Sequence, residues 1–92
     1  MAIFLVALST GGIMEQPELS YSNFQLIEAA SAKKAKEIYN IKNNCSYFYG
    51  EPIAKVNDSE KVEPFLPQLG SNIRLLLDLS FAGILERAEN EI

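Results

Sequence analysis

The chain has 92 residues, of which 48% are apolar, and this length and composition fit a single domain over residues 1–92 with a modest core. It has no histidine and only one cysteine, which excludes an internal disulfide, a structural zinc site and a histidine-dependent nucleophilic triad. The net charge of −4 argues against non-specific binding to DNA or RNA, because that binding needs many Lys and Arg side chains.

Apolar stretches near both ends of the chain could indicate a secretory signal or a membrane helix, but neither stretch fits. Residues 1–8 are apolar, but no Lys or Arg precedes them and the run stops at residues 9–12, which predicts a strand and not a secretory signal. The longest apolar stretch near the C-terminus is interrupted by Arg74 and Asp78 and is shorter than the roughly 20 residues of a membrane helix. We therefore expect no membrane span and a soluble protein of the reducing cytoplasm, the host cytoplasm if the source is viral, with Cys45 as a small buried hydrophobe.

Two strands and a helix are expected in the first half of the chain. Residues 3–8 are continuously apolar, which is typical of a strand covered on both faces, whereas residues 11–22 show no period and indicate a loop. Residues 24–29 alternate as a strand does, and we predict that they pair antiparallel with the first strand. Ser31 is a good N-cap for a helix over about 31–43, which two consecutive asparagines end.

A third strand is predicted around a glycine and a proline. Residues 47–49 open it, Gly50 and Pro52 bend or bulge it, and residues 53–56 resume the alternation. Because proline cannot donate a hydrogen bond to a sheet, we expect an edge strand here.

The remainder predicts a connector and a long helix. Residues 57–69 are polar and contain two prolines, which favours at most one short helical turn, and Ser71 then caps a helix that runs to about Glu89. The resulting order, β-β-α-β-α, predicts an α+β fold with a small three-stranded sheet. In it the second and third strands run parallel, the helices pack on one face, and a long helix ends the chain.

No arrangement of residues points to catalysis. The carboxylates follow neither the spacing of a metal loop nor that of an acid–base pair, and we interpret them as solvated surface. Thr10-Gly11-Gly12 follows a strand but matches neither a P-loop nor a dinucleotide fingerprint, so it is interpreted as a turn. We predict that the protein is not an enzyme and has no metal site and no cofactor.

Positive charge at the start of the first helix is the first feature that suggests a ligand. Lys33, Lys34 and Lys36 place cations at the positive end of the helix dipole, where a bound phosphate would compensate them. The alternative is that they are exposed lysines, partly relieved by Glu37. Arg74 is a candidate for a further phosphate contact, although an i,i+4 pair with Asp78 is its alternative use.

The sequence Tyr47-Phe48-Tyr49 is the second such feature. Strand alternation places Tyr47 and Tyr49 on one face and Phe48 on the other, so we expect Phe48 in the core and the two tyrosines displayed together. Paired tyrosines could stack on a nucleobase or contact a protein. Alternatively, the neighbouring helix or strands cover them.

The last helix suggests self-association. One apolar stripe has the spacing that packs on a sheet, and it comprises Ile73, Leu76, Leu77, Phe81, Ile84, Leu85 and Ala88. A second apolar row, Leu75, Leu79 and Ala82, lies outside that stripe and is predicted to form the interface of a homo-oligomer. We interpret Gly83 as the position where another helix crosses this one closely.

Three segments resemble small proteins encoded by phages and prophages of bacteria: residues 26–31 (LIEAAS), 35–39 (AKEIY) and 47–51 (YFYGE). The resemblance covers roughly half of the chain and contains no catalytic motif. It implies an accessory protein, and those that counter host immunity tend to be compact, non-enzymatic and oligomeric.

Two counter-defence classes fit these features. One is a sponge that sequesters a nucleotide immune signal such as a cyclic dinucleotide, and the other is an anti-CRISPR-like inhibitor that covers a surface of a host defence protein. We favour the sponge, with Lys33, Lys34, Tyr47, Tyr49 and Arg74 as its ligand-binding residues. An inhibitor would use the aromatic strand and the acidic N-terminal region to dock on a basic partner. A structural or assembly subunit of a virion is a third possibility.

Overall fold

The structure, a computed structural model, describes residues 1–9, 21–72 and 74–87. Four strands and five helical segments follow one another in this part of the chain. In chain order they are β1 (Ala2–Ser9), β2 (Tyr21–Ala29), α1 (Ala32–Lys42), β3 (Tyr49–Val56), α2 (Ser59–Val62), the 3-10 helix η2 (Glu63–Phe65), α3 (Leu66–Leu69), α4 (Arg74–Phe81) and β4 (Leu85–Arg87).

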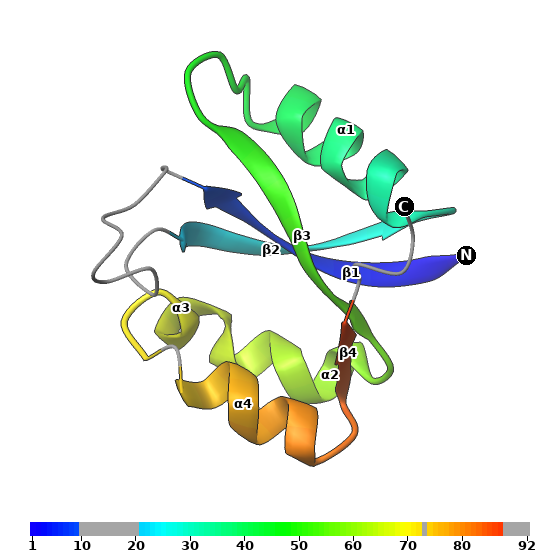
Figure 1. Cartoon of the computed structure of the whole chain (residues 1–92), viewed down its shortest axis with the longest axis vertical. Coiled ribbons are helices and arrows are strands. Elements are labelled where there is room, and N and C mark those ends of the chain that lie inside the picture. Colours follow the sequence, from blue (N-terminus) through cyan, green and yellow to red (C-terminus); the bar gives the residue numbers. More distant parts are fainter. Residues whose placement is uncertain (10–20, 73, 88–92) are drawn as a thin grey trace.

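The strands form one antiparallel sheet in the order β2-β1-β3-β4 (Figure 1). The α+β class and the antiparallel pairing of the first two strands are confirmed, but the sheet has four strands and not three. β2 and β3 both run antiparallel to β1, which lies between them, so these two strands run in the same direction without pairing.

Helices cover both faces of this sheet, which corrects the prediction that they pack on one face. α1 lies on one side, and α2, α3 and α4 lie on the other (Figure 1). The central strand β1 explains the arrangement, because its alternate side chains point to opposite faces. Phe4 and Val6 face α1, whereas Leu5 and Ala7 face the other helices, and all four are buried.

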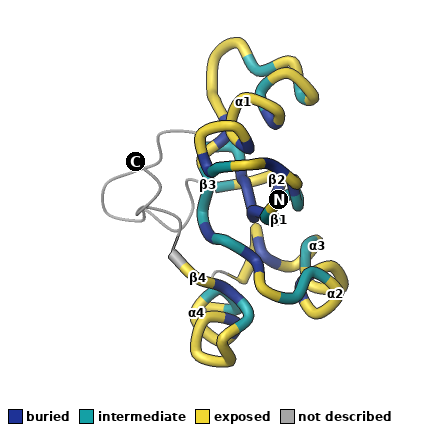
Figure 2. Tube along the Cα trace, turned by 90° about the vertical axis from the view of Figure 1, so that its right-hand side faces the viewer, coloured by how far each residue is buried: buried dark blue, intermediate teal, exposed yellow. Residues whose placement is uncertain are grey.

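Each face of the sheet therefore has its own core, and Figure 2 shows the buried residues between the two helical layers. The core beneath α1 consists of Phe4, Val6, Ile27, Ala29, Ala32, Ala35 and Tyr39. The core on the opposite face consists of Leu5, Ala7, Phe24, Ala54, Val56, Val62, Leu69, Leu79 and Leu85.

The third strand is bulged as predicted, but it is not simply an edge strand. Leu5 pairs with Ala54 and Val6 with Pro52, so one extra residue of β3 bulges between these pairs. β4 pairs with β3 only over Ala54–Val56. Pro52 thus lies at the bulge and on the half of β3 that has no β4 partner, which suits a residue that cannot donate to a second strand.

The connector after β3 is more helical than predicted. The segments α2, η2 and α3 follow one another directly, and they bury Val62 and Leu69 in the core. Pro64 and Pro67 lie at the first positions of η2 and α3, where a helix does not need the missing N–H. Within the described ranges, no helix is long and apolar enough to cross a membrane.

The prediction of a long C-terminal helix is wrong, because α4 ends at Phe81. Gly83 has a φ of +78°, its N–H donates to the Ser80 carbonyl at 3.0 Å, and the Ile84 N–H donates to the Leu79 carbonyl at 3.0 Å. This is a Schellman motif, in which glycine accepts the left-handed conformation that ends a helix. Gly83 is thus a helix stop and not a helix crossing, and β4 follows it. Residues 73, 88 and 89, which the predicted helix also included, lie outside the described residues.

The two apolar rows predicted for the last helix are both divided between core and surface, because Leu76, Ile84 and Leu85 of the first row and Leu75 and Leu79 of the second pack in or against the core. Leu79 is buried in the core and Leu75 is half-buried against it, so neither is free to form an oligomer interface as predicted. Ala82 is exposed beyond the end of α4. Leu77 and Phe81, expected to pack on the sheet, are exposed instead. The predicted capping residue Ser71 donates its hydroxyl to the Gln68 carbonyl at 3.2 Å and thus bonds to the end of α3.

Gly50 allows α1 to approach β3 closely. The Tyr39 ring packs against it, so that a methyl group at Gly50 would lie 2.9 Å from Tyr39 Cγ and closer still to Cδ1. The Gly50 N–H also donates to Asn40 Oδ1 at 2.7 Å. Two successive helical residues therefore hold the beginning of β3 by packing and by a hydrogen bond.

We expect Leu79→Ala to lower the free energy of unfolding by about 2–5 kcal/mol, because it removes a buried side chain and leaves a cavity. Leu77→Ala is the matched control on the exposed side of α4 and should change the stability by less than about 0.5 kcal/mol. Urea unfolding of the two variants measures the difference. Equal losses would contradict the assignment of the buried face.

Gly50→Ala should destabilise the protein by about 1–3 kcal/mol, since the added methyl overlaps the Tyr39 ring. Gly70→Ala is the control, because a Cβ there meets nothing within 4 Å and its φ of −68° suits alanine. It should be neutral or slightly stabilising. Thermal unfolding compares the two, and in a Tyr39→Leu background the loss caused by Gly50→Ala should shrink.

Candidate functional site

The most unusual surface feature is a run of three exposed aromatic residues, Tyr47, Phe48 and Tyr49, which we name the aromatic corner. Their exposed fractions are 89%, 47% and 51%. Tyr47 and Phe48 precede β3, so strand alternation does not govern them, and Phe48 is not the core residue that the sequence predicted. The centroids of the Tyr47 and Phe48 rings lie 6.3 Å apart with the planes tilted by 50°.

The aromatic corner lines an open hollow of about 370 Å³ together with Ser9, Lys36, Gly50 and Glu51. Its position follows from the fold, because Ser9 ends β1 and pairs with Tyr49 at the start of β3. The hollow thus combines three aromatic rings with one cation and one anion. Such a surface can offer ring faces to a ligand and orient it through Lys36 and Glu51.

Lys33 and Lys34 are not among the residues that line the hollow of the aromatic corner. Lys33 and Lys34 lie in the first turn of α1, near Ala29, which pairs with Ala2 at the beginning of β1. The aromatic corner lies beside Ser9, at the other end of β1. Lys33 and Lys34 precede Lys36, which reaches this hollow, by three and two residues, so they lie within one helical turn of it without lining it.

In the first turn of α1, Lys34 follows the alternative interpretation, that of an exposed lysine paired with Glu37. Lys34 Nζ lies 3.2 Å from Glu37 Oε2, so the lysine is paired along the helix. The Lys34 N–H donates to Ser31 Oγ at 3.2 Å, which confirms Ser31 as the N-cap. Lys36, from the next turn, is the lysine that lines the aromatic hollow.

Arg74 does not belong to this site. It begins α4, on the face of the sheet opposite α1, and its side chain is exposed. The ion pairs among the described residues do not include one between Arg74 and Asp78. The structure therefore places Arg74 away from the aromatic strand, where it was predicted to contact a phosphate, and does not show the alternative pair with Asp78.

A polar network beneath the aromatic corner ties α1 to the edge strand β2. The Tyr39 hydroxyl donates to the Asn23 carbonyl at 2.7 Å, and Asn23 has a φ of 50° at a bulge, where two β2 residues face the single residue Ala7. The side-chain amides of Asn43 and Gln25 form two hydrogen bonds with each other, at 3.0 and 3.2 Å. Asn43 also caps the end of α1, as predicted.

The environment of Tyr39 keeps its phenol neutral at physiological pH. Burial, and to a smaller degree the neighbouring Cys45, raise the pKa of Tyr39 above its ordinary value, and the Asn23 side chain and the Leu8 backbone oppose this only in part. Cys45 is half-buried against the same core. Tyr39 is therefore a structural donor that holds the bulge and supports Gly50, the glycine next to the aromatic corner.

Sequence reasoning missed Tyr21, which it assigned to a loop. Tyr21 begins β2, and its hydroxyl donates to Glu51 Oε2 at 3.2 Å. Partial burial, followed by the nearby Glu51 carboxylate, raises the pKa of Tyr21. Ser22, also predicted for that loop, lies in β2 as well, and residues 11–20 lie outside the described residues. The bulge at Asn23 breaks the alternation between Tyr21 and Phe24, so the strand pattern of residues 24–29 did not extend to this earlier start.

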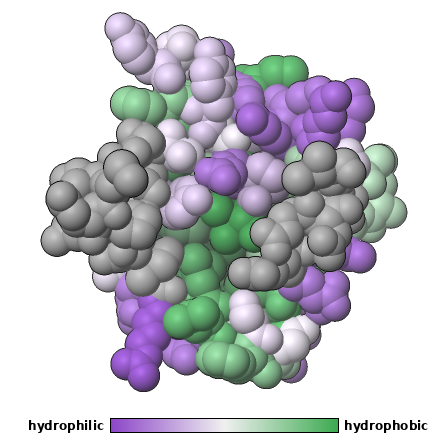
Figure 3. All heavy atoms as spheres, in the orientation of Figure 1, coloured by the Kyte–Doolittle hydropathy of each residue, from purple (hydrophilic) through white to green (hydrophobic). Residues whose placement is uncertain are grey.

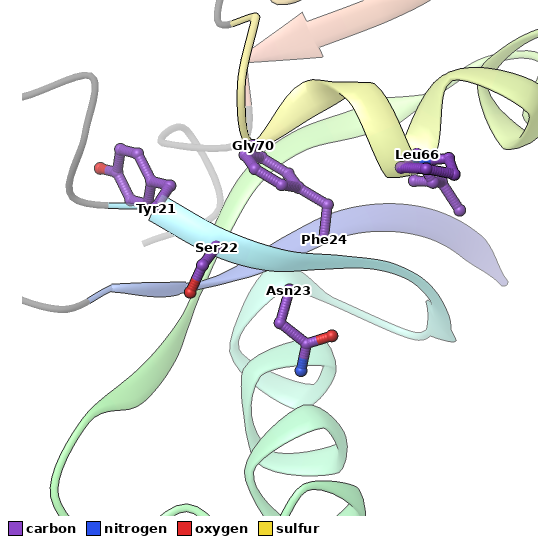
Figure 4. Close-up of a pocket in the computed structure, with 7 residues that line it drawn as sticks. Tyr21, Ser22, Asn23, Phe24, Leu66 and Gly70 are labelled. Atoms are coloured by element: carbon purple, nitrogen blue, oxygen red, sulfur yellow. The ribbon is translucent and has the colours of Figure 1, made fainter.

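Tyr21 also lines a second hollow, of about 380 Å³, between β2 and α3. Figure 4 shows the Tyr21 and Phe24 side chains on the side of β2 that faces Leu66 and Gly70, and the Ser22 and Asn23 side chains directed away from it. The second hollow thus presents mainly apolar groups. In the part of the chain that the structure describes, no three acidic or cysteine side chains gather where they could hold a metal ion.

A scan against models of protein families, a search of curated proteins and a search of solved structures each found no match to this chain.

Proposed function

We propose that the protein is a non-enzymatic binding protein whose aromatic corner docks on the surface of another protein. The observation that carries the proposal is the exposure of Tyr47, Phe48 and Tyr49 together on an anchored turn. Aromatic residues dominate the energetic centres of protein interfaces, because they bury a large area while ordering few rotatable bonds. Three consecutive rings left in water provide such a centre.

The shape of the aromatic corner favours a protein over a small molecule. Sites for small molecules are usually concave and bury most of the ligand surface. Here Tyr47 is almost fully exposed, and Phe48 and Tyr49 are about half exposed, so a small ligand would keep much of its own surface in water. A protein surface, in contrast, can cover all three rings at once and exclude water around them.

The nature of the partner follows from the resemblance to phage-encoded accessory proteins. From this resemblance, the expected partner is a host defence protein. The chain would act by covering a functional surface of that protein. The net charge of −4 suits a partner with a basic surface, whose approach the charge would accelerate. Catalysis is not needed for such blocking, in keeping with a chain that has no histidine.

A second candidate function, a sponge for a nucleotide signal, is favoured by Lys36. This lysine lines the same hollow as the three aromatic residues. A nucleobase could stack on a ring while a phosphate meets the ammonium group, with stacking contributing about 1–3 kcal/mol per base. Lys36 would then take the role that the sequence assigned to Lys33 and Lys34.

Capture from a bacterial lysate by the immobilised full chain tests the first proposal. We expect one protein to be retained in near-equal amount, and Tyr47→Ala combined with Phe48→Ala to reduce its capture more than about tenfold. Ile41→Ala is the control, since Ile41 is 78% exposed on α1 but lies outside the hollow. It should retain the partner, and unfolding curves should show that the variants are folded.

Calorimetry with cyclic dinucleotides separates the second function from the first. If the sponge is correct, binding falls with Lys36→Ala and with rising salt, because the contact with phosphate is ionic. Retention of the same protein by the wild type and by the corner variant, or nucleotide binding that depends on Lys36, would contradict the protein-docking proposal.

A further inference from the structure

The outer side of α4 carries an apolar pair with no cover. Leu77 and Phe81 are 59% and 87% exposed, and their i,i+4 spacing places them on one face of the helix. Figure 2 shows the outer side of α4 as exposed, and in Figure 3 hydrophobic side chains gather over the lower part of the molecule, where α4 lies. Leu75, Leu76 and Leu79 supply the packing of α4 on the core, and Leu77 and Phe81 do not belong to the core that the described residues form.

Two opposite charges accompany this apolar pair. Arg74 precedes Leu77 by three residues and Phe81 by seven, while Asp78 directly follows Leu77, and both charged side chains are exposed. Among the described residues, no ion pair joins Arg74 to Asp78. The outer side of α4 thus presents an apolar centre with a cation toward its N-terminal end and an anion nearer its middle.

This distribution of charge is self-complementary. When two identical helices pack antiparallel across a twofold axis near Leu77, the N-terminal Arg74 of each copy lies at the level of the other copy's Phe81, within one turn of its Asp78. A guanidinium can then contact the ring and reach the carboxylate. Parallel packing would instead place Arg74 beside Arg74 and Asp78 beside Asp78, which is repulsive.

We propose that two copies of the chain associate through the outer sides of their α4 helices, packed antiparallel, with Leu77 and Phe81 at the centre and Arg74 of each copy directed to Asp78 of the other. The eight residues of α4 span about 12 Å, so the contact is smaller than the roughly 800 Å² per partner of a standard interface. The dimer is therefore weak and concentration-dependent.

Association through α4 is independent of what the aromatic corner binds, and it leaves that surface free. α4 and α1 lie on opposite faces of the sheet, so a dimer through α4 leaves both aromatic corners open (Figure 1). A partner that offers two sites would then be held by both copies, with an avidity above that of one corner.

Sedimentation velocity over a concentration series up to about 1 mM tests the association, since this range reaches weak affinities. The wild type should shift from monomer to dimer, and Leu77→Ala combined with Phe81→Ala should stay monomeric. Ile41→Ala, an exposed apolar residue on the opposite face, should behave as the wild type. A monomeric wild type, or loss of the dimer with Ile41→Ala, overturns the proposal.

Charge reversal identifies the packing. Asp78→Arg and Arg74→Asp should each weaken self-association, because each variant places like charges on both helices. An equimolar mixture of the two variants should associate more strongly than either alone, since the two cations on α4 of one copy then meet the two anions on α4 of the other. A mixture no stronger than the separate variants overturns the antiparallel arrangement, while circular dichroism verifies that each variant is folded.

Discussion

The burial of β1 on both faces is the constraint on which the rest of the structure depends. Phe4, Leu5, Val6 and Ala7 are almost completely inaccessible to water, and successive side chains of a strand point in opposite directions. An apolar strand of this kind is stable only in the middle of a sheet with a helical layer on each side. The return of β3 to the far side of β1, the position of α1 and the packing of the later helices all satisfy this requirement.

The two-sided arrangement also decides which surfaces remain for function. On one face, α1 is held against β3 by the contact of Tyr39 with Gly50 and by the hydrogen bond from Gly50 to Asn40. This attachment presents the aromatic corner on a fixed turn and not on a free loop. On the other face, α4 buries one side and leaves Leu77 and Phe81 in water. The proposed docking surface and the proposed dimer surface can therefore act at the same time.

The candidate site could be predicted in part. The aromatic composition of residues 47–49 identified an unusual surface, and that surface is exposed. The cation that accompanies the rings was misjudged, because a helix dipole argument favours the lysines of the first turn, whereas the second-turn Lys36 lines the hollow. The contact from Tyr21 to Glu51 joins residues 30 positions apart, and no local pattern could indicate it.

The sequence by itself determined the α+β class, the first strand, the cap of α1 at Ser31 and the bulge near Pro52, because each depends on residues that are neighbours in the chain. It also determined the absence of histidine chemistry. Gly83, which follows the end of α4 in the left-handed conformation, is a local stop signal that the sequence analysis interpreted as a helix crossing, and only the tertiary structure decided that Leu85 enters a fourth strand. The apolar spacing of residues 73–85 favours a helix throughout, and pairing with Val56, a partner distant in sequence, is what places Leu85 in a strand.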